Sequence, residues 1–191
     1  MSTLSFLGLS KEQWDFINSF SNWFAAIGTL AAVFVSLWLA ARASRIRTSA
    51  SVGHRLIMEP GAKGKPPEVV VFRLVNTGDR IVRITGIGWK IGFRRWQRNA
   101  LQMHDPSQSS PLPVELNHGQ EASWVVPLDA REEGWLESFS SKMLMPNWRF
   151  STRFLRAQFF TSVGEVITVV PEASLLHRIR ETCERLSAND G

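Results

Sequence analysis

The stretch "EVVVFRLVNTGDRIVRITGIGWKIGF", residues 68–93, contains two runs of β-branched and aromatic residues. The runs cover 68–75 and 80–93, and Asn, Thr, Gly and Asp at 76–79 separate them. Turn-forming residues between two strand-like runs predict a β-hairpin. The first run alternates so that both of its faces are mainly apolar, which predicts a strand partly buried on both sides.

The second run has a predicted inward face that is interrupted. Arg83 and Thr85 break the apolar alternation on this face, and the glycines at 86 and 88 favour a β-bulge or a close backbone approach. The apolar residues predicted to share the face are Ile81, Ile87, Trp89 and Ile91.

Further strand signals follow at short intervals. "PVELNHGQEASWVVPL", residues 113–128, gives two short extended pieces around turn residues at 117–119. "RFSTRFLRAQFFTSVGEVITVV", residues 149–170, gives a longer hairpin that turns near 162–165. Frequent short strands separated by turn residues predict a mainly β domain, and an immunoglobulin-like β-sandwich of about six to eight strands is the most economical architecture.

Two short helices are expected within and after this domain. Residues 132–145 carry apolar side chains at spacings of three and four before Pro146 ends the helix, namely Trp135, Leu136, Phe139 and Met143. A second helix is expected to begin at Pro171. Its apolar residues fall on one side of the helix, namely Leu175, Leu176, Ile179, Cys183 and Leu186.

The segment 23–41 is nineteen residues without a charge. As a helix it would measure about 28 Å, close to the hydrocarbon thickness of a bilayer. Trp23 and Trp38 lie near its ends, where indole side chains favour the headgroup level. A buried core helix and a secretory signal peptide are the alternatives, but Lys11 is the only basic residue before the segment, so we expect an uncleaved membrane anchor.

The basic residues after this segment predict the topology. Arg42, Arg45 and Arg47 follow the span, which places the N-terminus outside and the remainder in the cytoplasm, at the cell inner membrane. The predicted division is an extracytoplasmic interfacial helix at 1–22, a single-pass transmembrane helix at 23–41, a basic juxtamembrane tether at 42–50, the β-sandwich at 51–171, and a C-terminal amphipathic helix and tail at 172–191.

Small side chains recur every four residues along the predicted span and form one stripe, made of Gly28, Ala32, Ser36 and Ala40. Small residues let two helices approach closely in lipid, where packing drives association. The stripe therefore predicts a homo-oligomer formed by helix–helix packing, the alternative being that alanine is simply abundant here.

The chain shows no pattern typical of catalysis. Its four histidines are scattered, the His104–Asp105 pair falls in a loop beside a proline, and Cys183 lies on the apolar side of a helix. We therefore expect a protein that is not an enzyme and uses no metal and no cofactor.

A basic and aromatic segment, "KIGFRRWQR" at 90–98, is the strongest candidate for binding in a chain of net charge +5. Guanidinium groups suit phosphates, and tryptophan supplies stacking or interfacial burial. Because the domain is tethered beside a membrane, lipid headgroups are favoured over a nucleotide or nucleic acid. The alternative is that these charges are solvated and discourage edge pairing. The candidate residues are Lys90, Arg94, Arg95, Trp96 and Arg98.

The N-terminal span followed by "LVNTGDRIVRITGIGW", "PVELNHGQ" and "LRAQFFTSVGE" resembles small uncharacterised bacterial and phage-associated single-pass membrane proteins with an immunoglobulin-like cytoplasmic β-sandwich. The resemblance covers residues 20–171 and carries no catalytic or ligand residues.

Two classes of function follow from these expectations. The first is a membrane-anchored interaction module that presents the β-sandwich to a protein partner of unknown identity. The second is a ligand-gated membrane effector, of the anti-phage or abortive-infection type, that perturbs the bilayer. A further alternative is an accessory subunit of a larger membrane complex.

Overall fold

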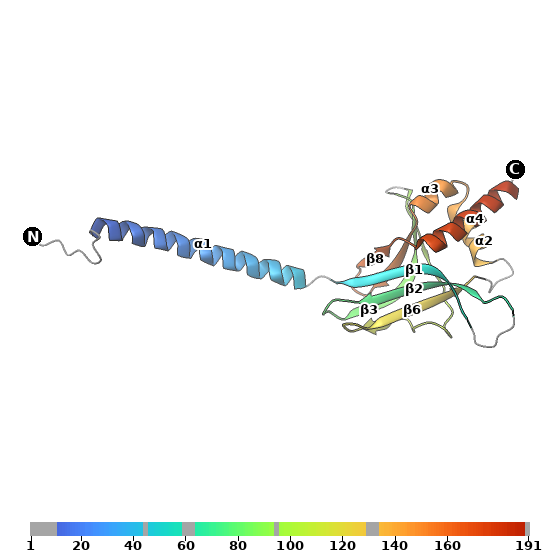
Figure 1. Cartoon of the computed structure of the whole chain (residues 1–191), viewed down its shortest axis with the longest axis horizontal. Coiled ribbons are helices and arrows are strands. Elements are labelled where there is room, and N and C mark those ends of the chain that lie inside the picture. The colour runs from blue at the N-terminus through green and yellow to red at the C-terminus, as the bar shows by residue number, and fades with distance from the viewer. Residues whose placement is uncertain (1–10, 44–45, 59–63, 94–95, 129–133, 190–191) are drawn as a thin grey trace, which may run out of the picture. The chain divides into compact units, whose positions relative to one another are not determined.

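The computed structural model describes residues 11–43, 46–58, 64–93, 96–128 and 134–189. The chain divides into two compact units, Met1–Arg45 and Ile46–Gly191. In its described part the first unit is a helix, α1 (Lys11–Ala43), and the second unit is a β domain with short helices (Figure 1).

Helix α1 is continuous over 33 residues, so no break separates the predicted interfacial part from the predicted span. Within it, Trp23–Arg42 forms a 20-residue segment that is long and apolar enough to cross a membrane, and none of this segment is buried in the protein. Phe16, Phe20 and Phe24 follow one another along the preceding turns, with ring centroids 5.7 and 5.8 Å apart. The helix therefore exposes a long apolar surface that the described part of the chain does not cover.

The strands form two antiparallel sheets, which confirms the mainly β prediction. The first sheet has the order β1-β2-β6 and consists of β1 (Thr48–Leu56), β2 (Glu68–Asn76) and β6 (Glu121–Pro127). The second has the order β4-β3-β7-β8, with β5 also paired to β3, and consists of β3 (Val82–Ile91), β4 (Arg98–Leu101), β5 (Val114–Leu116), β7 (Arg156–Thr161) and β8 (Val166–Val169). The first strand begins at Thr48, inside the segment predicted as a tether.

The predicted hairpin of residues 68–93 is wrong, because β2 and β3 belong to different sheets. The side chain of Asn76 stabilises the segment that crosses from one sheet to the other. Its Nδ2 donates to the carbonyls of Arg80 (2.7 Å) and Leu116 (2.8 Å), and its Oδ1 accepts from the amide of Gly78 (3.0 Å). Both strands carry a mainly apolar face, and because the strands join different sheets, these two faces pack against each other in the core.

The predicted bulge in β3 is present, and it changes which residues face inward. The pairing of β3 with β7 shifts between Ile84 and Gly86. Before the shift Val82 and Ile84 are buried, and after it the inward positions are Ile87, Trp89 and Ile91. Ile81, predicted to share the inward face, is 62% exposed. An extra residue in one strand reverses the alternation, and this reversal accounts for the error.

Aromatic side chains join the two sheets in the core. Phe72 of β2 meets Trp89 of β3 edge to face, with ring centroids 5.1 Å apart, and also contacts Phe159 of β7 at 5.9 Å. Trp124 of β6 lies 5.9 Å from the same Phe159 ring. All four side chains are almost fully buried, so the two sheets share one apolar interior.

The helices of the second unit lie between and after the strands. They are α2 (Trp135–Phe139), the π-helical turn η2 (Ser140–Leu144), α3 (Trp148–Arg153) and α4 (Ala173–Asn189). The predicted helix ending before Pro146 corresponds to α2 and η2. The β7–β8 hairpin is confirmed, but α3 occupies the start of the run predicted as strand, and its first turn begins where the Asn147 carbonyl accepts from the amides of Phe150 and Ser151.

Helix α4 packs on the β domain as its apolar spacing predicts. Leu175, Ile179 and Cys183 are fully buried. Burial raises the pKa of the Cys183 thiol. The C-terminal helix is therefore part of the core, and Cys183 is one of its small apolar contacts.

Candidate functional site

The predicted basic and aromatic segment lies between β3 and β4, and the structure leaves it at the surface. Phe93 is 59% exposed and Trp96 is 84% exposed. Gly92 turns the chain here with φ of +87°, and a Cβ at this position would collide with the carbonyl oxygen of Trp96. Arg94 and Arg95 fall outside the described residues.

Helix α3 supplies a second half of this surface that the sequence analysis missed. Phe154, which follows α3, lies 6.0 Å from Phe93 and 4.6 Å from Phe150 between ring centroids. Phe150 is 54% exposed. A hollow of about 700 Å³ adjoins these rings, lined by Ile91, Gly92, Trp96, Gln97, Arg98, Asn147 and Phe150.

Basic residues lie on the strands and the helix that carry or adjoin these aromatic rings. Lys90 of β3 and Arg156 of β7 are directly paired across the sheet. Arg156 Nη1 donates to the Arg153 carbonyl (3.2 Å), and Arg98 Nη2 donates to the Met143 carbonyl (3.0 Å). We define the aromatic–basic face as Phe93, Trp96, Phe150 and Phe154 with Lys90, Arg98, Arg149, Arg153 and Arg156.

The cations of this face differ from several other cations of the domain. Among the described residues, none of the five makes an ion pair with a carboxylate. Stretches 80–104 and 138–164, which supply the face, contain no Asp or Glu. Five other arginines of the domain are paired with acidic groups, in Arg55–Glu172, Arg73–Glu121, Arg83–Glu115, Arg178–Glu68 and Arg185–Glu137. The aromatic–basic face therefore carries uncompensated positive charge.

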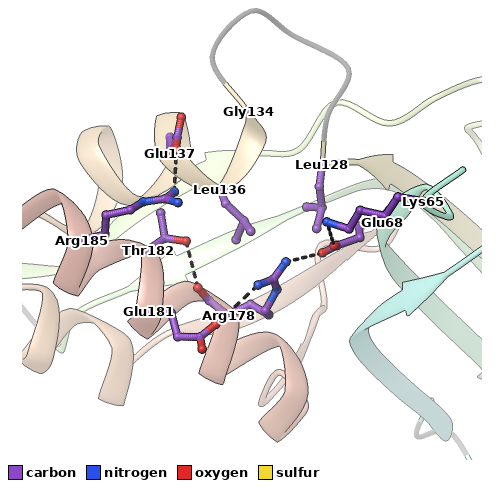
Figure 2. Close-up of a pocket in the computed structure, with 10 residues that line it drawn as sticks. All are labelled: Lys65, Glu68, Leu128, Gly134, Leu136, Glu137, Arg178, Glu181, Thr182 and Arg185. Carbon is purple, nitrogen blue, oxygen red and sulfur yellow. Dashed lines mark hydrogen bonds and ion pairs between the residues drawn. The ribbon is translucent and has the colours of Figure 1, made fainter.

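A pocket of about 610 Å³ lies between the start of β2 and the helices α2 and α4 (Figure 2). Glu68, only 7% exposed, lies at one end of this pocket. Its carboxylate accepts from Lys65 (2.6 Å) and Arg178 (2.5 Å), and His54 Nε2 lies 3.1 Å away. The hydrogen bonds from Lys65 and Arg178 lower the pKa of Glu68 from 4.5 to about 2.

The remaining charges of the pocket are also paired. Arg185 contacts Glu137 of α2 at 2.6 Å, and Arg178 contacts Glu181 at 3.6 Å, so three basic and three acidic side chains balance each other in the lining. Figure 2 shows these pairs linking α4 to α2 and to the start of β2. This arrangement fastens α4 to the sheet, and it leaves no excess charge to bind a ligand.

Other residues considered in the sequence are not brought together. The described residues contain no cluster of three or more His, Cys, Asp or Glu side chains able to hold a metal ion. Asp105 accepts from the amide (2.9 Å) and hydroxyl (2.7 Å) of Ser107, which lowers its pKa and stabilises the loop.

The predicted helix-packing residues are exposed on α1, as is the whole apolar segment. Nothing lies within 4 Å of the position where a Gly28 side chain would begin. At the end of the segment the Arg42 guanidinium lies 5.3 Å from the Trp38 ring. Arg45 is outside the described residues, and the Arg47 carbonyl accepts from the Thr77 amide (3.0 Å). The stripe Gly28, Ala32, Ser36 and Ala40 is thus an exposed surface of α1.

No protein-family model matches the chain, and no curated protein matches it. Among solved structures, it is similar to a crystal structure of a Bordetella pertussis protein assigned as ApaA, with 15% identity, 66% of this chain and 89% of that chain covered, and a TM-score of 0.29. A structural-genomics target shows 9% identity over 65% of this chain and 82% of its own, with a TM-score of 0.27. Scores this low carry no information on function.

Proposed function

We propose that this protein is a single-pass, membrane-anchored interaction module whose β domain binds a protein partner. The observation that carries the anchor is the segment Trp23–Arg42, which is apolar over 20 residues and has none of its residues buried. Apolar surface left in water costs roughly 25 cal/mol per Å², and a bilayer removes this cost for the whole helix. The basic residues that follow support a cytoplasmic β domain at the inner membrane.

The arrangement of the strands supports the finer architecture, an immunoglobulin-like β-sandwich. Two antiparallel sheets share one aromatic core, and the chain crosses from β2 in one sheet to β3 in the other. Such crossings between packed antiparallel sheets are typical of immunoglobulin-like folds. Domains of this kind present sheet edges and loops to their partners.

One sheet edge is better suited to a partner than the others. The outer edge of β6 is covered, since its amides and carbonyls bond to Asp105, Ser109 and Ser110. The β1 edge is covered at Val52, whose carbonyl accepts from the Glu172 amide. The outer edges of β4 and β5 each carry a charged residue, Arg98 and Glu115, which discourages strand pairing. The remaining edge, β8, contains only Val, Ile and Thr and has no buried residue.

The backbone groups that β8 offers can be assigned from its ladder. The Thr161 amide donates to the Glu165 carbonyl, so the backbone amides and carbonyls of every second residue from Glu165 point toward β7. The intervening residues, Val166 and Thr168, direct their amides and carbonyls outward. Val166 and Val170 are 40% and 54% exposed beside them. This edge fits an extended apolar segment of a partner protein, added as a further strand.

Binding of a partner at the β8 edge is tested with Thr168→Pro, which removes one outward-facing amide and none of the hydrogen bonds between β7 and β8. The full chain is cross-linked in native membranes and recovered through a C-terminal tag, with Thr168→Ala as the matched control. We expect one stoichiometric protein with the wild type and Thr168→Ala, and its loss with Thr168→Pro. Recovery with all three chains would move the interface away from β8, and recovery with none would contradict the interaction module.

The anchor is tested separately by alkaline extraction of membranes. Val33→Asp combined with Phe34→Asp places two charges near the centre of the apolar segment, at a cost of about 2.5–3.5 kcal/mol each. We expect the wild type to remain in the membrane pellet and the double variant to leave it. Ile81→Asp, at an exposed position of the β domain, is the control and should remain in the pellet. A wild-type chain released by alkali would contradict the anchor.

A further inference from the structure

The aromatic–basic face presents two features that are costly in a protein surrounded by water. Trp96, Phe93 and Phe150 are each more than half exposed, and they belong to one continuous set of rings and hollow. Isolated exposed apolar residues are ordinary, but a contiguous aromatic patch marks a surface that is covered by something else.

The charges around the patch indicate what covers it. Lys90 and Arg156 are directly opposite each other on neighbouring strands, an arrangement of like charges that is unfavourable without an anion nearby. The five cations of the face have no carboxylate partner among the described residues, whereas Arg55, Arg73, Arg178 and Arg185 of the same domain are each paired with a glutamate. The complementary surface is therefore anionic and also accepts aromatic rings.

A membrane interface containing anionic lipids has both properties. Its headgroups carry negative charge, and aromatic side chains are favoured at the level between headgroups and acyl chains. An acidic protein surface would compensate the charges, but it would have to supply its own apolar site for three exposed rings.

The anchor proposed above brings this surface within reach of a bilayer, and the inference rests on that anchor. The apolar segment ends at Arg42 and β1 begins at Thr48. Six residues span at most about 20 Å, so the domain is held close to the leaflet. Docking is then an intramolecular event at high effective concentration, and modest contacts are sufficient.

We infer that the β domain docks through the aromatic–basic face onto the anionic lipids of the membrane in which the chain is anchored. Phe93, Trp96 and Phe150 enter the interface, and the surrounding Lys and Arg side chains bind lipid phosphates. The chain enters the domain at Thr48, which pairs with Asn76 just before β3 begins, whereas the face lies beyond Ile91, where β3 ends. Docking of the face therefore lays the domain along the membrane surface.

The test uses the full chain in nanodiscs that hold one copy each, composed of phosphatidylcholine alone or mixed with phosphatidylglycerol. Amide hydrogen exchange is measured in both lipids. We expect slower exchange at 92–98 and 148–154 in the anionic discs only, with the protection lost at high salt. Exchange of the β6 edge should be equal in both lipids.

Matched variants separate the roles of charge and ring. Arg153→Glu should reduce the occupancy of the docked state by about tenfold, because it removes one attractive charge and adds a repulsive one. Trp96→Ala should also reduce the occupancy at low salt, because it removes the most exposed ring from the interface without changing the charge. Arg73→Glu, on the other sheet, should leave the protection at 92–98 and 148–154 unchanged and is the control.

The outcomes distinguish the inference from the anchor on which it rests. A chain that resists alkaline extraction yet shows equal exchange at 92–98 in both lipids would overturn docking and leave the anchor intact. Protection that appears in both lipids only when two copies share a disc would assign the face to a second copy and overturn lipid docking. A chain extracted by alkali would contradict the anchor, whatever the exchange shows.

Discussion

Glu68 and Arg178 are 110 residues apart in the sequence, and a guanidinium nitrogen of Arg178 lies 2.5 Å from a carboxylate oxygen of Glu68. The pair connects the first residue of β2 with the middle of α4. It is the central contact of a network that also includes Lys65 and His54, and it fixes the C-terminal helix against the sheet.

Removal of Arg178 should destabilise the domain. In Arg178→Met the buried Glu68 carboxylate keeps its hydrogen bond from Lys65 but loses the one from Arg178. We therefore expect a loss of about 1–3 kcal/mol in the free energy of unfolding. Thermal unfolding of the full chain in nanodiscs measures the loss. Arg180→Met, an exposed neighbour on the same helix, should be close to neutral. Equal effects of the two substitutions would contradict a role for the pair.

The stability of the domain should fall at acid pH through Glu68. Its pKa is about 2 in the folded protein against an ordinary value of 4.5, so the carboxylate stabilises the fold fully above pH 4.5. This contribution is lost as the pH falls from about 4.5 to about 2. Glu68→Gln should flatten the decline of the unfolding midpoint over this window. Parallel pH curves for the two proteins would show that other groups are responsible.

Gly92→Ala should lower the free energy of unfolding more than Gly164→Ala does. Both glycines have positive φ, +87° and +82°, so alanine at either position costs about 1–2 kcal/mol in backbone strain. At Gly92 the added Cβ also meets the Trp96 carbonyl, whereas at Gly164 it meets open space. Unfolding free energies of Gly92→Ala and Gly164→Ala give the difference directly. Equal losses would mean that the turn at 92–96 relaxes freely.

Self-association should depend on the small-residue stripe of α1. Gly28→Ile and Ala32→Ile place bulky side chains where two helices would approach, so we expect a lower fraction of cross-linked dimers or larger oligomers in membranes. Ala26→Ile makes a similar change about 200° away around the helix from Gly28 and should leave the oligomers unchanged. An identical oligomer distribution for all of these variants would contradict packing through the stripe.

Much of the β domain could be predicted from the sequence, because strand formation follows local alternation and turn residues. The β7–β8 hairpin, the bulge before Gly86 and the apolar side of α4 are confirmed for this reason. Which sheet a strand joins is a long-range property. The two runs around Asn76 look like a hairpin locally, but they pair in different sheets, and the Asn76 side chain bonds to the carbonyls of Arg80 and Leu116 where the chain crosses.

The binding surface could be predicted only in part. Residues 90–98 stand out by their composition, but Phe150 and Arg153 join them from a helix more than 50 residues later in the chain. The sequence predicts strand where this helix forms, because the aromatic residues in "RFSTRF" also suit a sheet. The Glu68 network was not predicted, since Glu68 and Arg178 come together only when the fold is complete.

The burial of Cys183 gives this protein an internal reporter. It is the only cysteine of the chain, and α4 must separate from the sheet before a thiol-reactive reagent can reach it. The rate of its modification in the native protein therefore measures how often the C-terminal helix opens. No engineered label is needed to follow that motion, in a vesicle or in a living cell.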